Sequence, residues 1–242
     1  MRPHQRKNAV KGQKGESAAL DPNRPVFFYM PNEGAYGLFC QWHSTRYEVP
    51  LASLNWLRTA HPKSTLKSIL EDEELGEFTF NSSEQFMMYC KALYFSDPEA
   101  GTKILASSDP KEQKRLGREV QGWDDYIWLQ VCERVAFEGN WWKFGPNRGW
   151  REVLLSTNER EICEASSKDR RWGIGYNEKN AMAYRNKWGS NLLGKALTRV
   201  RTKVKERLKE IEEGLRTDWD LPDVSMWGHH EQENEGGELE GR

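Results

Sequence analysis

The most regular pattern in the sequence is a long amphipathic helix, which we expect to begin at Ser190 and Asn191. Its apolar residues recur three and four positions apart, a spacing that places them on one face of an α-helix. Lysine, arginine and glutamate occupy most other positions, so only one face of this helix can pack against a domain. The apolar face consists of Leu192, Leu193, Ala196, Leu197, Val200, Val204, Leu208 and Ile211.

Gly194 lies within this helix and does not suit it. A glycine in a helix interior costs about 1 kcal/mol relative to alanine. We therefore expect another backbone or a ligand to approach the helix closely at this position.

The preceding sequence predicts further helices and several short strands. Helices are expected after Ser82 or Ser83, which can act as N-caps, and after two Asp-Pro pairs that combine an N-cap with a proline at the first helical position. The Asp-Pro pairs are at 97–98 and 109–110, and further helices are expected over 123–144 and after Pro146. Strands are predicted over 26–30, 37–42, 46–49 and 160–166, where aromatic and β-branched residues gather.

The two ends of the chain differ from this middle part in composition. Residues 1–25 are polar and mostly basic, and residues 214–242 become acidic and glycine-rich. Neither has a periodic apolar face, so we expect a disordered basic arm and a disordered polar tail around one domain at 26–213. The arm could contact phosphate, although the net charge of −1 argues against general nucleic-acid binding.

Composition also excludes several classes of protein. No apolar run is long enough for a membrane helix, and the first residues carry no apolar signal segment. The four cysteines are scattered, which is typical of a reduced protein inside the cell, in the cytoplasm or the nucleus, without structural zinc. No serine, cysteine or histidine triad is apparent, so any enzyme here is expected to work through carboxylates.

Glu84 is the first candidate catalytic residue. It lies in the first turn of an apolar helix, where an unpaired carboxylate is costly unless it has a task. Lys91, seven residues further on, falls on the same face two turns away. The alternative is a solvated surface pair.

A second candidate segment covers residues 164–175. Glu164 and Asp169 precede Trp172 and two glycines, Gly173 and Gly175, whose backbone could approach a phosphate closely. An ordinary turn is the alternative.

Two further residues have a structural and a functional interpretation. Asn191 could bind an anion at the start of the last helix or simply cap that helix. Trp128 could stack on a base or belong to the core, and the core interpretation is favoured.

Six segments, in this order, resemble the NADAR/YbiA-like family. The first motif of that family reads Gly-x-Phe-Ser-Asn-Phe, and the second is a helix with Glu-His-x-x-Gln-x-x-Lys. The matching segments here are GLFCQW at 37–42, EQFMMYCK at 84–91, Gly117-Arg118, Trp128 ahead of Lys143-Phe144, EASSKDRRWGIG at 164–175, and NLLGKALTRVR at 191–201.

Several positions depart from the family pattern. Cys40 and Gln41 replace Ser-Asn, Gln85 replaces His, Met88 replaces Gln, and Thr198 replaces Met. The differences are expected to tune the pocket and its substrate rather than the fold.

The resemblance implies a compact, helix-rich α+β domain with a small sheet. It also implies hydrolysis of N-glycosidic bonds in phosphorylated ribosyl or ADP-ribosyl compounds, with no metal and no cofactor. Glu84 and Asp169 would be the catalytic carboxylates, while the ligand would be held by Lys91, Arg118, Trp128, Glu164, Trp172, Gly173, Gly175 and Asn191.

Two other hypotheses remain open at this point. One is a module that binds ADP-ribose or a related nucleotide without turnover, for which the changed residues at 41, 85 and 88 leave room. The other is a factor that uses the basic arm to find ADP-ribosylated nucleic acid. The sequence decides neither the leaving base nor the oligomeric state.

Overall fold

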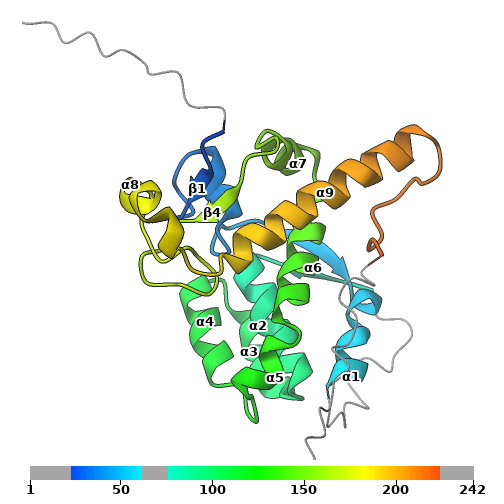
Figure 1. Cartoon of the computed structure of the whole chain (residues 1–242). Helices are drawn as coiled ribbons and strands as arrows, with labels where there is room; N and C mark the ends of the chain where they lie inside the picture. The colour runs from blue at the N-terminus through cyan, green and yellow to red at the C-terminus, as the bar shows by residue number, and fades with distance from the viewer. Residues whose placement is uncertain (1–22, 62–75, 224–242) are drawn as a thin grey trace, which may run out of the picture.

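The computed structural model describes residues 23–61 and 76–223, and most of the described helices pack around α2 and α6 (Figure 1). The α-helices are α1 (Trp56–Ala60), α2 (Ser83–Tyr94), α3 (Pro98–Ala106), α4 (Pro110–Arg118), α5 (Asp125–Leu129), α6 (Cys132–Phe144), α7 (Arg148–Leu155), α8 (Glu178–Ala181) and α9 (Leu192–Glu212). The strands are β1 (Val26–Phe28), β2 (Tyr47–Pro50), β3 (Glu77–Phe80) and β4 (Ile162–Glu164). Three short 3-10 helices are η1 (Ala35–Phe39), η2 (Leu51–Leu54) and η3 (Met182–Lys187).

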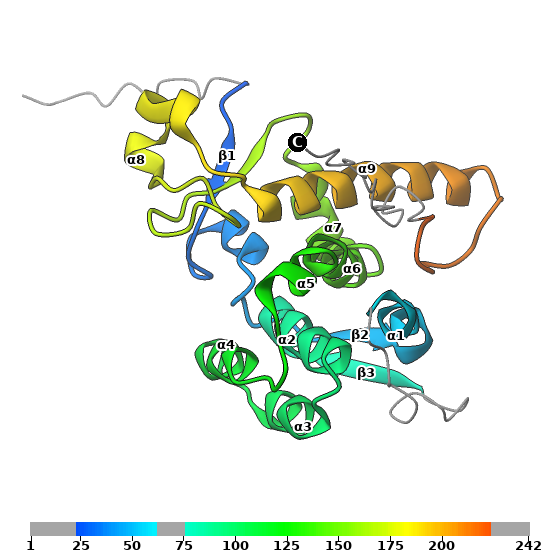
Figure 2. The same ribbon diagram turned by 60° about the horizontal axis from the view of Figure 1, so that its bottom comes forward.

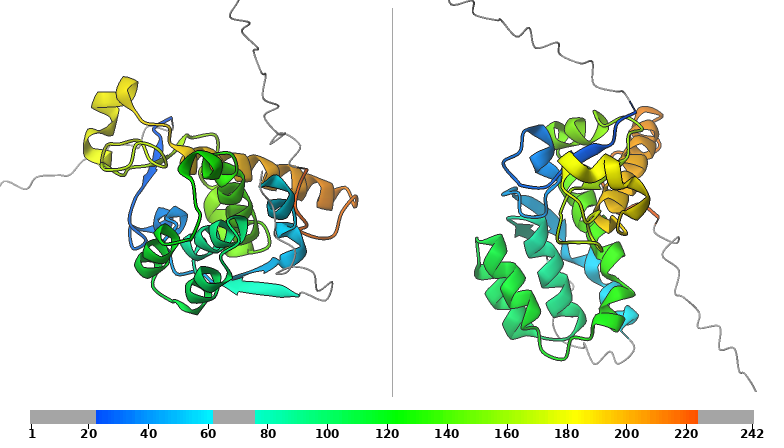
Figure 3. Two further views of the ribbon diagram at one scale, coloured as in Figure 1. Left: turned by 90° about the horizontal axis from the view of Figure 1, so that it is seen from below. Right: turned by 60° about the vertical axis from the view of Figure 1, so that its left-hand side comes forward.

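The strands form two separate two-stranded sheets rather than one. β1 and β4 pair in parallel, and β2 and β3 pair antiparallel. Figure 3 shows the first sheet beside α8 and the second at the opposite side of the molecule. The helix-rich α+β class is confirmed, and its β component is divided between two ends of the domain.

The prediction of a strand over 37–42 is wrong. This segment instead forms the end of η1 and the turn that follows it. Gly37 permits this close path of the chain, because a Cβ there would lie 2.5 Å from the carbonyl oxygen of Pro31. The chain therefore turns back on itself here, and residues 40–42 reach the pocket described below.

Helix α2 is the centre of the domain. Its N-cap is Ser82, whose Oγ accepts a hydrogen bond from the backbone N–H of Gln85 at 3.0 Å, as the sequence predicts. The helix packs against α3 and α4 on one side and α6 on the other (Figure 2). All but one of its residues are buried, so the polar groups that it carries are removed from water.

The helix expected over 123–144 is two helices, because the chain breaks around Val131 between α5 and α6. Helix α6 is buried on nearly all sides rather than on one face. Gly139 permits its close approach to α2, since a Cβ there would lie 2.5 Å from Cδ1 of Phe86. Helices α3 and α4 begin at the two Asp-Pro pairs, as predicted. The helix predicted after Pro146 is α7, and Asn147 caps it.

Gly194 shows why a glycine interrupts α9. A Cβ at this position would lie 2.0 Å from the carbonyl oxygen of Ile162 in β4. Another backbone therefore occupies the space, as one of the two sequence interpretations predicts. Helix α9 packs on α6 and β4 through its apolar face.

The end of the described chain does not leave the domain at residue 214 as expected. Trp219 packs on Trp141 with ring centroids 5.6 Å apart, and its carbonyl accepts a hydrogen bond from the Trp141 indole at 3.2 Å. Arg207, which is 3% exposed, donates to the carbonyl of Asp218 and the carboxylate of Asp220. Residues 1–22 and 224–242, where the rest of the disorder prediction falls, lie outside the described residues.

Replacing Trp219 with alanine should lower the free energy of unfolding by about 2 kcal/mol, because the indole leaves a half-buried site against Trp141 and Gly145. Leu215→Ala is the control, since Leu215 is 70% exposed and should change stability by less than about 0.5 kcal/mol. Urea unfolding measures both. Equal, negligible changes would show that the segment contributes nothing to the fold.

Candidate active site

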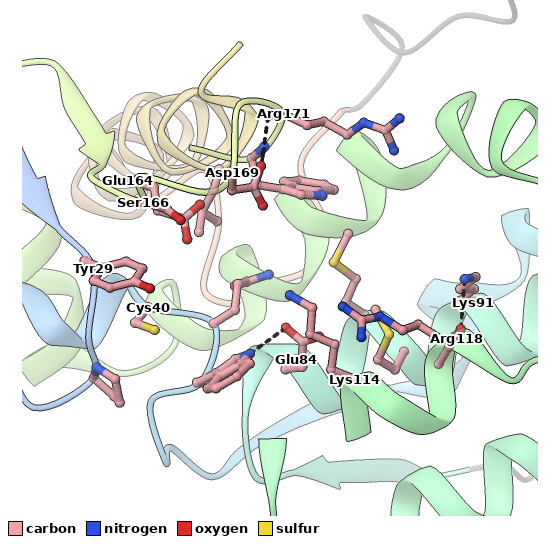
Figure 4. A pocket seen from close by; sticks show the side chains of 18 of the residues that line it. Tyr29, Cys40, Glu84, Lys91, Lys114, Arg118, Glu164, Ser166, Asp169 and Arg171 are labelled. Carbon is pink, nitrogen blue, oxygen red and sulfur yellow. Dashed lines mark hydrogen bonds between the residues drawn. The ribbon is translucent and has the colours of Figure 1, made fainter. Parts of the chain in front are cut away.

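A pocket of about 420 Å³ opens between α2, α4 and the chain segments that follow η1 and β4. Figure 4 shows Glu84, Lys114 and Arg118 on one side of it, and Glu164, Ser166 and Asp169 on the other. Carboxylates therefore reach one cavity from two distant parts of the sequence. Such a convergence of polar groups in a largely apolar cavity is typical of an active site.

Glu84 lies in the first turn of α2 and is 5% exposed. Its Oε2 accepts a hydrogen bond from the indole Nε1 of Trp42 at 3.2 Å. Burial raises the pKa of this carboxyl, while Lys114, the Trp42 hydrogen bond and Arg118 oppose the rise. The carboxyl forms no ion pair with any residue in the described ranges, which removes the sequence alternative of a solvated pair with Lys91.

Glu164 ends β4 and faces the same pocket. Its Oε2 is buried and has no hydrogen-bond partner among the described residues. Burial, followed by the nearby charge of Asp169, raises the pKa of Glu164 to about 7, and Glu84 adds to the rise while Lys114 opposes it. The charge of Glu84 therefore acts on Glu164, whose raised pKa lets it hold a proton close to neutral pH.

Lys114 and Arg118 bring positive charge to the carboxylates from α4. They are four residues apart, so both side chains leave the same face of the helix. Lys114 affects the pKa of both Glu84 and Glu164. Arg118 makes no hydrogen bond or ion pair with the part of the chain that the structure describes, which leaves its guanidinium available to an anion.

Asp169 lines the pocket, but one of its oxygens is already in use. Oδ1 accepts hydrogen bonds from the backbone N–H groups of Arg171 and Trp172, at 2.9 Å and 2.8 Å. The carboxylate thus fixes the turn that carries Trp172 into the pocket wall, and its second oxygen remains for a ligand.

Lys91 lines the pocket two turns after Glu84, but its ammonium already has partners. Its ammonium donates to the carbonyl of Gly117 at 2.8 Å and lies 3.5 Å from the ring centroid of Trp123. Burial lowers the pKa of Lys91 to about 8, an effect that Asp125 opposes. Asp125 in turn forms a bidentate pair with Arg171 at the same pocket.

Aromatic rings form much of the pocket wall. Trp172 and Trp123 line it with intermediate or greater exposure, and Tyr29 is 43% exposed at its edge. Trp128 is a buried core residue that packs on Tyr94, and it also lines the pocket, where a base could stack on it. Flat apolar faces beside paired carboxylates suit a ligand that carries an aromatic base.

Three predicted ligand residues lie outside the pocket. Asn191 instead joins α9 to β4, since its amide donates to the carbonyl of Ile162 at 2.8 Å and accepts from the N–H of Glu164 at 3.1 Å. Gly173 and Gly175 give room to neighbouring chain rather than to a phosphate, because a Cβ would meet Glu164 O at 2.8 Å or the Arg170 side chain at 2.7 Å.

Gln85 does not tune the pocket as expected. Its side-chain oxygen accepts from the backbone N–H of Asn81, and its nitrogen donates to the carbonyls of Ile104 and Ser107. This residue holds the connection between α3 and α4. Gln41 and Met88, by contrast, do line the pocket, as does Cys40.

Sequence reasoning missed Lys114, Trp42 and Ser166 as pocket residues. The spacing of Lys114 and Arg118 on an expected helix was a usable signal, because an arginine that binds an anion makes a lysine on the same face a candidate. Nothing in the sequence pairs residue 42 with residue 84.

Among the described residues, no group of three acidic, histidine or cysteine side chains is placed to hold a metal ion. No described helix has the length and apolarity to cross a membrane.

Comparisons with known proteins identify relatives of this chain. The family model of the NADAR domain matches residues 27–205. A protein named N-glycosidase from Acanthamoeba polyphaga mimivirus is 34% identical over 186 residues, which cover 75% of this chain and 97% of that protein. A protein named riboflavin biosynthesis protein from Vibrio vulnificus is 31% identical over 118 residues, 49% of this chain and 30% of that protein.

The solved structure of YbiA from Escherichia coli shares the fold. It superposes with a TM-score of 0.53 at 21% identity and covers 82% of this chain and 92% of that chain. The family match and the relatives named N-glycosidase define a hydrolase-type enzyme and support N-glycosidase activity in general. The chain belongs to the NADAR domain family.

The raised pKa of Glu164 gives a prediction about stability. A carboxyl whose pKa is higher in the folded state destabilises the fold as pH rises from its ordinary value near 4.5 to about 7. The Glu164→Gln variant has no carboxyl group at this position and does not lose stability in this way. The difference in free energy of unfolding between the variant and the wild type should therefore grow from about pH 4.5 to about pH 7 in favour of the variant, and then level off. Urea unfolding between pH 4 and 8 measures the difference, and two parallel curves would contradict the assigned environment.

Proposed function

We propose that the protein hydrolyses the N-glycosidic bond of a phosphorylated ribosyl compound, including compounds in which the ribosyl group is part of ADP-ribose. The observation that carries the proposal is a pair of glutamates, the buried Glu84 and the half-buried Glu164, which face one pocket from α2 and β4 and differ in their surroundings. Glycoside hydrolysis commonly uses two carboxyl groups with different protonation states.

Glu164 is the proposed general acid. Its pKa of about 7 and its unpartnered Oε2 suit a carboxyl group that donates a proton to the departing base. The C1′–N bond breaks, the bonding electrons leave with the base, and the proton from Glu164 neutralises the base nitrogen. The aromatic wall formed by Trp172 and Trp128 holds that base.

Glu84 is the proposed carboxylate beside the sugar. Burial raises its pKa, but Lys114, the Trp42 N–H and Arg118 oppose that rise and favour the ionised form, in which it can stabilise positive charge that develops at C1′. It then accepts a proton from the water whose oxygen bonds to C1′. Glu84 then releases that proton to solvent and Glu164 recovers one from solvent, so both carboxyl groups return to their starting state and the reaction balances. Asp169, with one oxygen held by its turn, is assigned to the ribose hydroxyl groups rather than to proton transfer.

The phosphate is assigned to the α4 side of the pocket. Arg118 has no partner in the described ranges, and Lys91 lies beside it with an ammonium that Gly117 and Trp123 already contact. Arg118 is therefore the principal phosphate ligand in this proposal and Lys91 the secondary one. Arginine also suits this role because its guanidinium can bind a phosphate through two hydrogen bonds.

The activity is tested by incubating the protein with a ribosylaminopyrimidine phosphate, with NAD and with ADP-ribosylated guanosine. Mass spectrometry detects a released base, and release from at least one compound is expected. Binding without release would favour the nucleotide-binding alternative. The nucleic-acid hypothesis depends on the basic arm, most of which lies outside the described residues.

The role of Glu84 gives a second test. Glu84→Gln should lower kcat at least about a hundredfold, the scale of a positioned acid or base, while KM changes only a few-fold. Glu138→Gln is the matched control, because Glu138 is also buried but binds Trp56 and Arg134 outside the pocket. Full turnover in the Glu84 variant would remove this residue from the mechanism.

Arg118→Ala should weaken binding of a phosphorylated ribosyl ligand by about 1.5–3 kcal/mol, the scale of a hydrogen bond to a charged group. The same ligand without phosphate should bind almost unchanged. Arg115→Ala on the same helix is the control, since Arg115 is paired with Glu112 and Glu119 at the surface. Calorimetry at one salt concentration compares the ligands, and equal losses for both would refute the phosphate assignment.

A further inference from the structure

Two hydrogen bonds join residues 41–42 to the first turn of α2. The backbone N–H of Glu84 donates to the carbonyl of Gln41 at 3.0 Å, and the indole Nε1 of Trp42 donates to Oε2 of the Glu84 side chain at 3.2 Å. One bond fixes the backbone of the glutamate and the other fixes its carboxylate. The second oxygen, Oε1, accepts no hydrogen bond from the described residues and remains for the ligand.

The indole of Trp42 also faces the ammonium group of Lys114. The ammonium of Lys114 lies 5.7 Å from the ring centroid of Trp42, within the range of a cation–π contact. Trp42 therefore contacts both Glu84 and Lys114, which come from different helices. An aromatic ring without an N–H could provide the contact with Lys114 but not the hydrogen bond.

Trp42 places a single N–H group on the carboxylate to which the proposed function assigns the sugar. A phenylalanine ring at this position would keep an aromatic face but would have no donor for this hydrogen bond.

We propose that Trp42 is a positioning residue that orients the Glu84 carboxylate, holding Oε2 and directing Oε1 to the ribosyl carbon. The proposal rests on the proposed function for its effect on turnover, but the hydrogen bond itself can be tested without turnover. Its physical consequence is twofold. The N–H restricts the rotation of the carboxylate, and it favours the ionised form because a carboxylate accepts the bond more strongly than a carboxyl group does.

Other charged groups act on Glu84 from each element packed around it. Lys114 and Arg118 of α4 favour its ionised form, and they remain in place when Trp42 is changed. Glu164 at the end of β4 and the Cys40 thiol face Glu84 as well, and the charge of Glu84 contributes to the raised pKa of each. The contribution of Trp42 therefore has to be measured as a difference between variants that share this surrounding charge.

Trp42→Phe is the direct test, because it keeps the ring and removes the N–H. Turnover should fall about tenfold, with KM within a few-fold, and the acidic limb of the pH profile of kcat should move upwards by about one pH unit. Carboxyl ¹³C NMR, with the Glu84 resonance assigned from Glu84→Gln, should show the same upward movement. Unchanged titration and an unchanged acidic limb in the folded variant would overturn the proposal.

Trp56→Phe is the matched control. Its indole also donates to a buried glutamate, Glu138, at 2.8 Å, but outside the pocket. This variant should lose stability and leave the pH profile of kcat and the titration of Glu84 unchanged. An equal shift in both variants would mean that loss of any buried indole disturbs the site, which would also overturn the proposal.

A measurement on the wild type covers the case in which Trp42→Phe does not fold. The indole ¹H–¹⁵N resonance of Trp42 should move with pH as Glu84 titrates, and Glu84→Gln should abolish the movement. An indole resonance insensitive to Glu84 refutes the hydrogen bond. If the wild type releases no base from any ribosyl compound while these NMR results hold, the proposed function fails and the assignment of Trp42 as the residue that orients Glu84 stands.

Discussion

Removal of carboxylates from water is the constraint on which this structure depends. Glu84 is 5% exposed in a helix that is buried on nearly every side, and neither it nor Glu164 has an ion-pair partner in the described chain. Such groups reduce stability unless hydrogen bonds and nearby charge compensate. Trp42 and Lys114 supply part of that compensation for Glu84, whereas Oε2 of Glu164 has no hydrogen-bond partner within residues 23–61 and 76–223. This difference is what separates the two glutamates chemically.

The fold serves to hold these groups at one place. Helix α2 carries Glu84, α4 packs beside it with Lys114, and β4 brings Glu164 from 80 residues further along the chain. Asn191 binds the backbone of β4 on both sides of Cys163, and Gly194 lets α9 lie directly against that strand. Residues that looked like ligand contacts in the sequence thus support the strand that positions Glu164. Their role is indirect, but the pocket depends on it.

Local sequence signals predicted the local structure well. N-caps at Ser82, Asp97 and Asp109 and the apolar face of α9 are determined by neighbours in the sequence, so they could be identified without a structure. The turn around Gly37 and the docking of Trp219 could not, because both depend on contacts with distant chain. The site followed the same rule. Glu84 and Asp169 could be identified as pocket residues from local context, whereas the link between residues 42 and 84 exists only after folding.

The central claim is that Glu84 and Glu164 act on opposite sides of one ribosyl C1′–N bond. A crystal structure of the Glu84→Gln variant with an uncleaved phosphorylated ribosyl compound tests it most directly. The account predicts C1′ beside residue 84, the base nitrogen within hydrogen-bond distance of Glu164, and the phosphate at Arg118. A ribose bound with both carboxyl groups on the same side of the bond, or with the base at α4 and the phosphate at Glu164, would contradict it.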